Sequence, residues 1–297
     1  MSLCVLSAGT WSLVVDGGRP RSRGLGIPVG GPADRTALTL GNALVGNAPD
    51  AAALEITLSG PMLVAEADVG LCIFGAPFQA ERDGEAIPPN HTFTLRQGQT
   101  LHIGGTLQGC RAYLCVPGGF QTPVVLGSRT DFSPVKAGDA LPCAASSLPG
   151  RSLAWGEVES PGPVSLRCLP GPQADWFDRS FFTHLYRVTP AADRMGVRLD
   201  GPPLIFPRRE LASEPVAPGA VQITNDGRPI VLGVDGQTIG GYPKVAHVIT
   251  ADWDALGQLR PGTAVSFPLV SEEEAEAASR ERAAVLAGWR RRIAISL

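Results

Sequence analysis

The amino-acid sequence predicts a mainly β protein built from two similar halves of barrel or sandwich type. Short apolar runs alternate with turn residues along its 297 residues, and 36 glycines and 27 prolines supply the turns. Many short strands between such turns are typical of barrels and sandwiches. A motif that recurs at a constant offset indicates two halves, and helical spacing is rare.

The elements follow from apolar spacing. A helix is predicted over 36–44, where Ala37, Leu40 and Leu44 recur at helical intervals. Two strands are expected at 231–234 and 245–250, on either side of a glycine-rich loop. Apolar runs also predict strands over 71–74, 92–95, 101–103 and 112–116.

A terminal helix is expected to begin at Ser271, because Ser271-Glu-Glu-Glu274 has the spacing of a capping box. We expect its apolar stripe to dock on the protein rather than to anchor in a membrane, since glutamates at its start and arginines at its end suit the helix dipole. The stripe consists of Ala275, Ala278, Leu286, Trp289 and Ile293.

The repeat has an offset of 159 residues. Ala-Asp-Arg followed by Leu at the eighth position occurs at 33–40 and again at 192–199. Acidic residues and an arginine in register favour two equivalent halves, and the alternative is a chance match. Stretches at 144–150 and 159–163 have linker composition. We therefore predict a first subdomain over 1–150, a second over 164–270 and a terminal helix over 271–297. The same offset aligns Asp16 with Asp175, Ala53 with Ala212, Glu55 with Glu214 and Gly60 with Gly219.

Composition argues against several classes of function. The net charge of -3 gives no basic footprint for nucleic acid or an anionic membrane. No apolar stretch approaches the roughly 18 residues of a membrane span. The six cysteines form no CxxC pair and the four histidines form no short ligand spacing, so no metal site is predicted. We expect a cytoplasmic protein with reduced thiols.

The stretch Asp235-Gly-Gln-Thr-Ile-Gly-Gly-Tyr-Pro-Lys244 is the strongest candidate for a functional loop. It combines two adjacent glycines with an amide, a hydroxyl, a phenol and one of the two lysines in the chain. Adjacent glycines let a backbone approach a ligand closely or adopt a positive φ. The alternative is a hairpin that uses glycine only to relieve its turn.

Further motifs, in the same order along essentially the whole chain, resemble the family of the 5-oxoprolinase C subunit. That family also includes the carboxyltransferase A/B region of urea carboxylase and a sporulation regulator that antagonises a kinase inhibitor. One departure from the family pattern is at position 21, where this chain has Arg21 after Pro20 and family members commonly have a glycine. The motifs are Asp16-Gly-Gly-Arg-Pro20, Gly24-Leu-Gly-Ile-Pro-Val-Gly-Gly-Pro-Ala-Asp34, Gly41-Asn-Ala-Leu-Val-Gly-Asn47, Ala53-Leu-Glu-Ile56, Arg167-Cys-Leu-Pro-Gly-Pro-Gln173, Asp193-Arg-Met-Gly-Val-Arg-Leu199, Ser213-Glu-Pro215, Gly219-Ala-Val-Gln222 and Gly240-Gly-Tyr-Pro243.

The resemblance implies two cyclophilin-like β-barrel subdomains with few short helices. It also implies partners, the B and A subunits of 5-oxoprolinase. The expected function is that of an ATP-dependent amidohydrolase, active only within this complex, which opens the lactam 5-oxoproline to glutamate. One alternative is the carboxyltransferase component of a urea carboxylase-like, biotin-dependent enzyme. Another is a non-catalytic antagonist of a kinase inhibitor that is similar to the B subunit.

ATP is the cofactor that the resemblance implies. Neither Lys136 nor Lys244 follows a glycine, so the chain has no P-loop and ATP is expected to be held with the partner subunit. Neither lysine lies in a Met-Lys-Met context, so no biotin is expected on this chain.

Both family reactions act on a planar amide, in a lactam or a ureide, and need fixed donors around a developing oxyanion. Arg35 and Arg194 are candidate catalytic residues that bind phosphate or carboxylate. Their neighbours Asp34 and Asp193 would orient them or accept a proton. The candidate substrate-binding residues are Gln173, Gln222, Gln237, Thr238, Gly240, Gly241, Tyr242 and Lys244.

Structural roles compete with these functional ones. Each Asp-Arg pair is alternatively an ion pair that braces a loop. Glu55 and Glu214 are expected to be buried carboxylates that accept backbone N–H bonds. Asp16 and Arg19 lie in a predicted turn.

Overall fold

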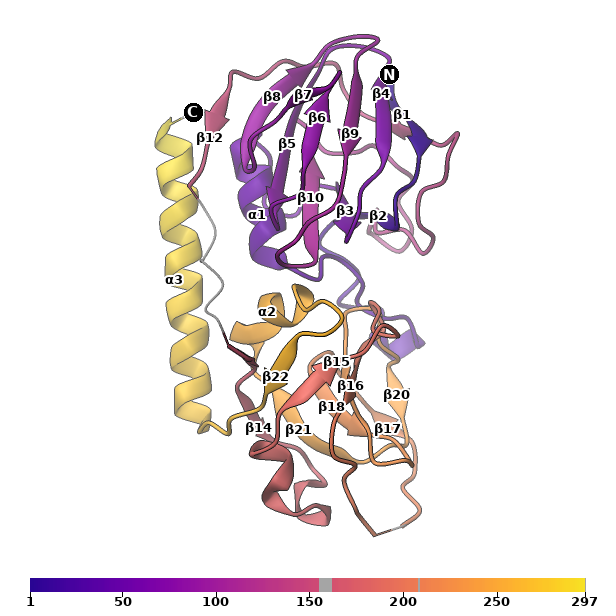
Figure 1. The fold of residues 1–297 in the computed structure, drawn as a ribbon, viewed down its shortest axis with the longest axis vertical. Coiled ribbons are helices and arrows are strands. Elements are labelled where there is room, and N and C mark those ends of the chain that lie inside the picture. The colour runs from indigo at the N-terminus through magenta and orange to yellow at the C-terminus, as the bar shows by residue number, and fades with distance from the viewer. Residues whose placement is uncertain (155–161, 208, 297) are drawn as a thin grey trace. The chain divides into compact units, whose positions relative to one another are not determined.

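The computed structural model describes residues 1–154, 162–207 and 209–296. The described chain is mainly β with few helices, which confirms the predicted fold class (Figure 1). It divides into two compact units. Unit 1 comprises Met1–Gly18, Gly30–Glu159 and Leu286–Leu297, and unit 2 comprises Arg19–Val29 and Ser160–Val285. Each unit thus joins segments that are distant in sequence, while the boundaries 1–150, 164–270 and 271–297 stay a prediction. The expected linker at 159–163 lies mostly outside the described residues.

Unit 1 contains two six-stranded sheets and helix α1. Its elements in chain order are β1 (Ser2–Ser7), β2 (Trp11–Val15), α1 (Arg35–Leu44), β3 (Ala53–Thr57), β4 (Met62–Ala65), β5 (Val69–Gly75), β6 (Ala80–Arg82), β7 (Glu85–Ala86), β8 (His91–Leu95), β9 (Thr100–Ile103), β10 (Arg111–Cys115), β11 (Ala140–Pro142) and β12 (Arg151–Ser152). The sheets have the orders β11-β1-β4-β9-β6-β7 and β12-β8-β5-β10-β3-β2. The predicted first helix corresponds to α1, and the four predicted strands that follow it correspond to β5, β8, β9 and β10.

Strand β10 shows how side-chain alternation builds the core of unit 1. Ala112 and Leu114 lie in a core cluster shared by both sheets. Tyr113 and Cys115 lie in a second cluster together with the buried side of helix α1. Successive side chains point to opposite faces of a sheet, so both faces at β10 are buried. That explains why residues 112–116 are continuously apolar in the sequence.

A buried acid, Glu55 of β3, organises the polar groups beneath helix α1. Its Oε2 accepts from the Tyr113 hydroxyl at 2.7 Å and from the backbone N–H of Ala33 at 2.9 Å. The Tyr113 hydroxyl in turn accepts from the Asp34 N–H at 2.8 Å. The Arg111 Nε lies 3.4 Å from the other Glu55 oxygen. The prediction that Glu55 is a buried carboxylate accepting a backbone N–H is therefore confirmed.

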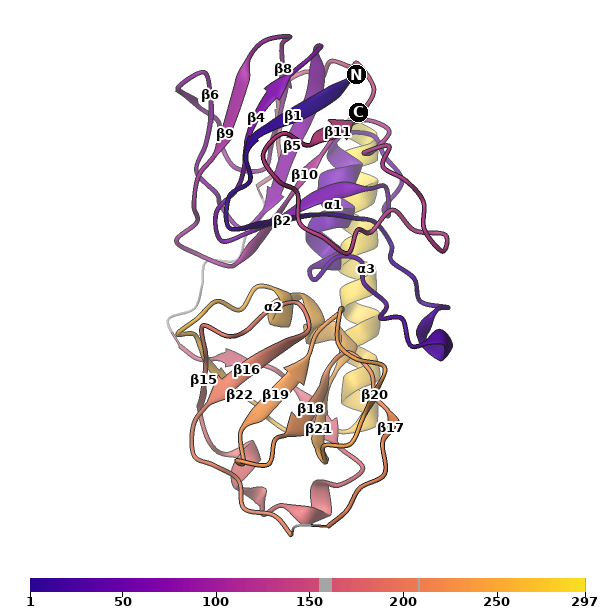
Figure 2. The ribbon, with the colours of Figure 1, turned by 90° about the vertical axis from the view of Figure 1, so that its right-hand side faces the viewer.

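Unit 2 is built on one eight-stranded sheet and one two-stranded sheet. Its elements are η1 (Arg23–Leu25), β13 (Val164–Ser165), β14 (Cys168–Pro170), η2 (Ala174–Trp176), η3 (Arg179–Phe182), β15 (Tyr186–Val188), β16 (Gly196–Asp200), β17 (Glu214–Pro215), β18 (Ala220–Ile223), β19 (Pro229–Leu232), β20 (Ile239–Gly240), β21 (Lys244–Val248), η4 (Thr250–Asp252), α2 (Trp253–Gly257) and β22 (Ala264–Ser266). The larger sheet has the order β13-β22-β15-β16-β19-β18-β21-β14, and β17 pairs with β20 (Figure 2). Its core includes the stacked rings of Phe181 and Phe267.

The ungapped repeat does not survive in the structure. Residues 37–41 lie in helix α1, whereas their counterparts at 196–200 form strand β16. A helix and a strand present side chains with different periods, so the two segments are not equivalent. The offset of 159 residues is therefore wrong as a structural register, although both units are β-rich.

Helix α3 (Glu272–Ser296) begins with the predicted capping box. Glu274 accepts from the Ser271 N–H at 2.7 Å, and the Ser271 hydroxyl accepts from the Glu274 N–H at 3.2 Å. In unit 2, Ala278 packs with Ile249 and Ala251, and in unit 1, Ile293 is buried in the cluster around α1. The predicted docking is therefore confirmed.

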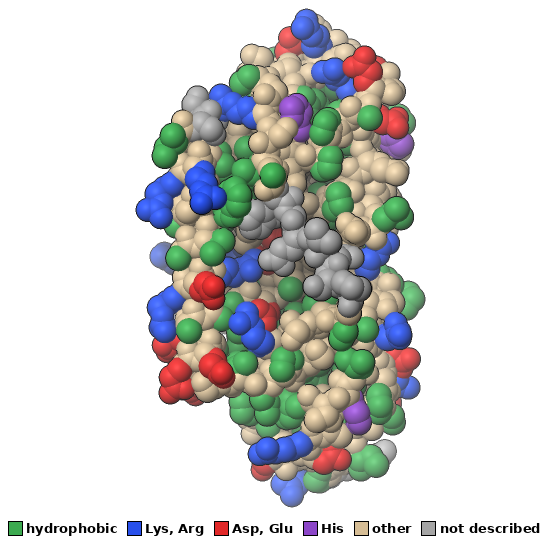
Figure 3. Space-filling model, turned by 60° about the vertical axis from the view of Figure 1, so that its left-hand side comes forward, with side chains coloured by type: hydrophobic (Ala, Val, Ile, Leu, Met, Phe, Trp, Pro, Cys, Tyr) green, Lys and Arg blue, Asp and Glu red, His purple; other side chains and the backbone are tan. Residues whose placement is uncertain are grey.

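Figure 3 shows acidic side chains at one end of α3 and basic ones farther along it. In the described part of the chain, no helix is both long and apolar enough to cross a membrane.

Asp16, which follows β2, anchors the hairpin at 122–130 in unit 1. Its carboxylate accepts hydrogen bonds from the Ser128 hydroxyl, from the Thr130 hydroxyl at 2.9 Å and from the Arg129 N–H at 2.6 Å. A fourth bond comes from the Gly18 N–H at 2.9 Å. Burial alone would raise the pKa of Asp16, but these hydrogen bonds outweigh burial and lower it.

Replacing Tyr113 with Phe should lower the free energy of unfolding by about 1–3 kcal/mol, because Glu55 and the Asp34 N–H each lose a buried partner. Urea unfolding measures the change. The matched control is Tyr186→Phe, since the buried Tyr186 hydroxyl has no hydrogen-bond partner among the described residues. That control should be neutral or stabilising. Equal losses in both variants would contradict the role of the Glu55 network.

Replacing Asp16 with Asn should destabilise the protein in a pH-dependent way. A carboxyl whose pKa is lowered by folding stabilises the native state above its unfolded pKa of about 3.9, and this contribution is lost as the pH falls through the folded pKa. The difference in urea midpoint between wild type and Asp16→Asn should be full at neutral pH and shrink in strong acid. A constant difference across that range would show that ionisation of Asp16 contributes nothing.

Candidate functional site

The loop predicted at 235–244 lies between β19 and β21 in unit 2. Its middle forms the short strand β20, where Gly240 pairs with Glu214 of β17. The loop is therefore not a simple hairpin turn. An ion pair holds each of its ends, and a two-residue β ladder holds its centre.

Lys244 holds the end of the loop. Its ammonium donates to Glu214 Oε1, and the same oxygen accepts from Gln173 Nε2 at 3.1 Å. The backbone N–H of Lys244 donates to Gln173 Oε1 at 3.0 Å, so both amide atoms of Gln173 are engaged. The hydrogen bond from Lys244, followed by that from Gln173, lowers the pKa of Glu214 despite an opposing effect of burial. This cluster is an ionised pair with an amide that orients both members.

Glu214 differs from its expected role. Its side chain is 37% exposed, and its hydrogen-bond partners are the Lys244 and Gln173 side chains. The prediction of a buried carboxylate that accepts backbone N–H bonds is wrong at this position. Glu214 lies in a two-residue strand of the small sheet, whereas Glu55 lies in a central strand covered on both faces.

Arg194 holds the start of the loop. Its Nε and Nη2 donate to the two carboxylate oxygens of Asp235 at 2.6 and 2.9 Å, and the Asp235 N–H donates to the Arg194 carbonyl at 3.1 Å. Such a two-pronged contact fixes orientation as well as distance. Asp193 accepts from the N–H groups of Met195 and Gly196 at 2.8 and 3.0 Å. Both residues of this Asp-Arg pair therefore have bracing contacts.

The other Asp-Arg pair lies in unit 1. Asp34 is the N-cap of helix α1, where its carboxylate accepts from the Ala37 N–H at 2.8 Å. Arg35 is the first residue of the helix and is exposed. A carboxylate at this position satisfies an end group of the helix and complements its dipole. The structure thus gives Asp34 a capping contact and leaves the catalytic roles predicted for both pairs as predictions.

A cluster of amides lies over Gly240. Gln222 of β18 is 2% exposed, and its Nε2 has no hydrogen-bond partner within the described residues. Gln237 of the loop donates from Nε2 to Gln222 Oε1 at 3.4 Å. A buried amide donor without a partner is unusual and costs free energy, so Gln222 is the most unusual polar group in this region.

Glycine at position 240 makes room for these two amides. A Cβ on Gly240 would lie 2.6 Å from Gln237 Nε2 and 2.7 Å from Gln222 Nε2. The backbone of Gly240 is not in the left-handed region, so close approach rather than a positive φ explains the glycine. The close approach is to the chain's own amides.

The remaining predicted residues lie on either side of the loop backbone. Thr238 is buried and its carbonyl accepts from the Val216 N–H at 3.0 Å, while Tyr242 is 37% exposed. Gly241 and Pro243 line a pocket of about 530 Å³ in unit 2. The loop thus contributes to two places in unit 2, the pair of amides over Gly240 and the lining of this pocket.

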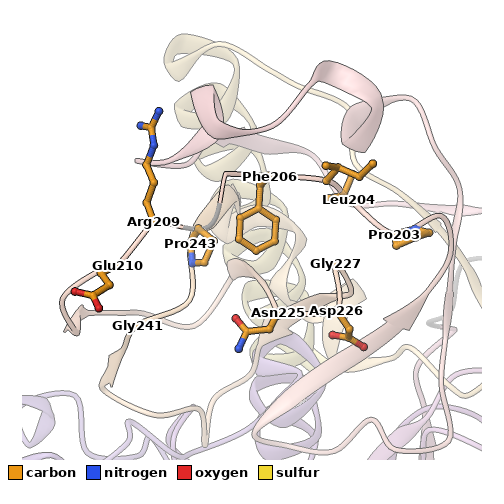
Figure 4. A pocket seen from close by; sticks show the side chains of 11 residues that line it. Pro203, Leu204, Phe206, Arg209, Glu210, Asn225, Asp226, Gly227, Gly241 and Pro243 are labelled. Atoms are coloured by element: carbon orange, nitrogen blue, oxygen red, sulfur yellow. The ribbon is translucent and has the colours of Figure 1, made fainter.

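Figure 4 shows this pocket with the Phe206 ring near Pro243, Asn225 and Asp226 together on one side, and the guanidinium of Arg209 directed away. A volume of this order suits a small organic ligand. Sequence reasoning missed most of its lining, because segment 203–210 has no motif and no periodic pattern. Asn225-Asp226-Gly227 carries a turn signal, but a turn signal alone predicts a hairpin and not a binding surface.

Three of the buried cysteines have thiols that are hard to ionise. Burial raises the pKa of the Cys72 and Cys115 thiols and raises that of Cys168 to about 12, so these cysteines are poor nucleophiles. In the described ranges, no three His, Cys, Asp or Glu side chains are grouped as a metal site requires.

Comparison with known proteins gives this geometry a context. The chain is 36% identical to the 5-oxoprolinase C subunit of Escherichia coli, over 94% of this chain and 95% of that protein. It is 34% identical to the 5-oxoprolinase C subunit of Haemophilus influenzae, with 91% and 92% covered. It is 29% identical to urea amidolyase of Saccharomyces cerevisiae, where the match covers 84% of this chain but 15% of the larger protein.

Solved structures show the same relationship. The urea amidolyase of Kluyveromyces lactis matches with a TM-score of 0.88 at 27% identity, over 97% of this chain and 20% of that one. The protein TTHA0988 matches with a TM-score of 0.81 at 39% identity, over 90% of this chain and 56% of that one. This chain therefore spans about half of one solved relative and a fifth of the other. Residues 25–269 match the family described as carboxyltransferase domain, subdomain A and B, and the chain belongs to that family.

Proposed function

We propose that this chain is the C subunit of an ATP-dependent 5-oxoprolinase, which opens 5-oxoproline to glutamate together with the A and B subunits. The observation that carries this proposal is the end-to-end match to two bacterial proteins that are named as 5-oxoprolinase C subunits. The matches to urea amidolyases cover only a small part of those proteins. Both groups of relatives are named as enzymes or as subunits of an enzyme.

The amide cluster of unit 2 supports a substrate that contains a planar amide. A lactam presents one C=O acceptor and one N–H donor on the same edge, and a glutamine side chain has the complementary groups. Gln222 has an unused donor, and Gln237 is exposed beside it. In the proposed reaction the exposed Gln237 amide contacts the lactam, the buried Gln222 amide supports Gln237, and the pinned loop keeps both fixed while charge develops on the carbonyl oxygen.

The residues around the loop do not fit the phosphates of ATP. The Lys244 ammonium already binds Glu214, and Arg194 binds Asp235 with two hydrogen bonds. Binding a phosphate there would require either cation to leave its carboxylate. We therefore place ATP with a partner protein and assign Lys244 and Arg194 to the support of the loop.

Carboxyl transfer in a urea carboxylase-like enzyme is the second candidate. The family description and the fold match to urea amidolyase favour it. A ureide substrate would present the same amide edge to the exposed Gln237, so the site accommodates both proposals. The two differ in their co-substrate, carboxybiotin or ATP, and in the partner that must supply it.

Reconstitution separates the two candidates. The purified chain alone should release no glutamate from 5-oxoproline, and a mixture with the A and B subunits should release it with consumption of ATP. Glutamate and phosphate release are measured in parallel. A verified three-protein complex without turnover of 5-oxoproline would overturn the leading proposal, and carboxylation of urea by a biotin-dependent partner would favour the second.

Replacing Gly240 with Ala tests the amide cluster. The added Cβ meets only the ends of two flexible side chains, so the fold should persist while the Gln222 and Gln237 amides move. Turnover in the reconstituted complex should fall by about tenfold to a hundredfold, since a displacement near 1 Å costs about that much in a positioned site. Steady-state kinetics and a thermal melt are measured together.

Gly105→Ala is the matched control in unit 1. Its backbone is not left-handed, and a Cβ there meets nothing closer than 3.6 Å. Turnover should be unchanged. Full turnover in Gly240→Ala with the fold intact would show that the amides do not orient the substrate.

A further inference from the structure

A cation beside the candidate loop has no acidic partner. Arg23 lies in the segment Arg19–Val29, which belongs to unit 2 together with the loop 235–244. Its Nη2 donates to the carbonyl of Val216. Within the described residues, its buried Nη1 has no hydrogen-bond partner and no carboxylate forms an ion pair with it. A guanidinium that is partly removed from water without such a partner costs free energy.

The contact with Val216 places the Arg23 guanidinium near the exposed amide of the loop. The Val216 N–H donates to the Thr238 carbonyl at 3.0 Å, and Thr238 directly follows Gln237. The Gln237 amide lies over Gly240, two residues beyond Thr238. Two residues of extended chain span about 7 Å. An amide and an uncompensated cation therefore lie within reach of one small ligand.

The neighbouring charges of the loop are already paired. Lys244 binds Glu214 and Arg194 binds Asp235, so neither carboxylate compensates Arg23 and neither cation assists it. A lone guanidinium suits a single carboxylate, which it can bind with two parallel hydrogen bonds. A triphosphate carries several negative charges, and one arginine would leave most of them without a partner. The charge balance therefore indicates a small monoanion.

A ligand reaches Nη1 of Arg23 when the side chain turns. The residue is half-buried, and Nη1 itself is covered. Space is open beside it, because a Cβ on Gly24 or Gly26 would meet nothing within 4 Å. Side-chain rotation on binding is common. Here it would give an unpaired donor a charged acceptor.

We propose that Arg23 binds the carboxylate of 5-oxoproline and thereby selects between the two candidate substrates. The inference rests on the proposed function, in which Gln237 contacts the lactam. 5-oxoproline carries a carboxylate on the carbon next to its ring nitrogen, whereas urea carries none. Gln237 alone accepts either amide, and Arg23 adds a charged contact that only the lactam acid can use. Arg23 is thus a specificity residue and takes no part in opening the ring.

A structural role competes with this one. The hydrogen bond from Arg23 to the Val216 carbonyl fastens segment 19–29 to the end of β17. A bracing arginine would affect every ligand of the loop to the same extent. A carboxylate-binding arginine affects only a ligand that carries the carboxylate.

The test uses steady-state kinetics of the reconstituted complex with the A and B subunits. Arg23→Gln removes the charge and keeps an N–H donor for the Val216 carbonyl, so the thermal melt should stay close to wild type. KM for 5-oxoproline should rise about tenfold to a hundredfold, because a charged hydrogen-bonded contact is lost. The kcat should stay close to wild type, as expected when uniform binding is removed. Arg21→Gln is the matched control, since Arg21 is exposed in the same segment.

A neutral analogue separates carboxylate binding from bracing. 5-oxoprolinamide keeps the lactam ring and carries a neutral amide in place of the carboxylate. Its inhibition constant should be the same in Arg23→Gln as in wild type. Arg23→Lys keeps the charge without the planar fork, so its KM for 5-oxoproline should lie between those of wild type and Arg23→Gln.

Each outcome decides a separate point. A raised KM in Arg23→Gln, with unchanged inhibition by 5-oxoprolinamide and a wild-type KM in Arg21→Gln, supports the assignment. A wild-type KM in Arg23→Gln, or an equal loss for both ligands, overturns it while turnover by the wild-type complex leaves the proposed function in place. A wild-type complex that does not open 5-oxoproline overturns the proposed function and, with it, the ligand assigned to Arg23.

Two further results are also decisive. If 5-oxoprolinamide does not inhibit the wild type, the KM of Arg23→Gln relative to that of Arg21→Gln decides. If Arg23→Gln does not fold, Arg23→Lys takes its place, since loss of the two-pronged contact should still raise KM several-fold. A wild-type KM in Arg23→Lys would then overturn the assignment.

Discussion

The burial of Lys244 is the constraint on which the candidate site depends. A lysine that is 5% exposed must have a partner for its charge, and Glu214 provides it. A buried ammonium without a carboxylate is strongly unfavourable, so the end of the loop is fixed wherever Glu214 is fixed. At the start of the loop, the buried Arg194 forms an ion pair with Asp235 in the same way. Two ion pairs hold the ends of residues 235–244, and the pairing of β20 with β17 holds their centre.

This arrangement separates support from recognition. The charged groups of the loop pair with one another, while the buried Gln222 Nε2 has no hydrogen-bond partner among the described residues and Gln237 donates to Gln222 Oε1. A neutral donor of this kind suits a neutral amide substrate better than a phosphate, which draws on cations. Under the proposed function, this chain would hold the amide and another component would supply the activated group.

Much of the fold could be predicted from the sequence, because strand and helix periods are local properties. Local sequence patterns correctly predicted the strands at 71–74 and 112–116 and the capping box at Ser271. The predicted repeat register was wrong because identical residues in the Asp-Arg motif do not determine whether a helix or a strand follows it. The partner of Arg194 is Asp235, 41 residues away, and no local pattern gives such a pairing. The pocket lined by residues of segment 203–210 could not be predicted for the same reason, since loop sequences have no periodic apolar pattern.

The assignment of residues to the two units has a consequence for synthesis of the protein. Residues 19–29 emerge early but belong to unit 2, and the segment Leu286–Leu297, which includes Ile293 of the α1 cluster, belongs to unit 1. Domains generally fold as units from the N-terminus as the chain leaves the ribosome. Here unit 1 lacks the last residues of its helical face until residues 286–297 have been synthesised. Apolar surface around α1 therefore stays uncovered after the rest of unit 1 has been made, and unit 1 is completed only after the segment Ser160–Val285 of unit 2, which precedes those residues in the chain.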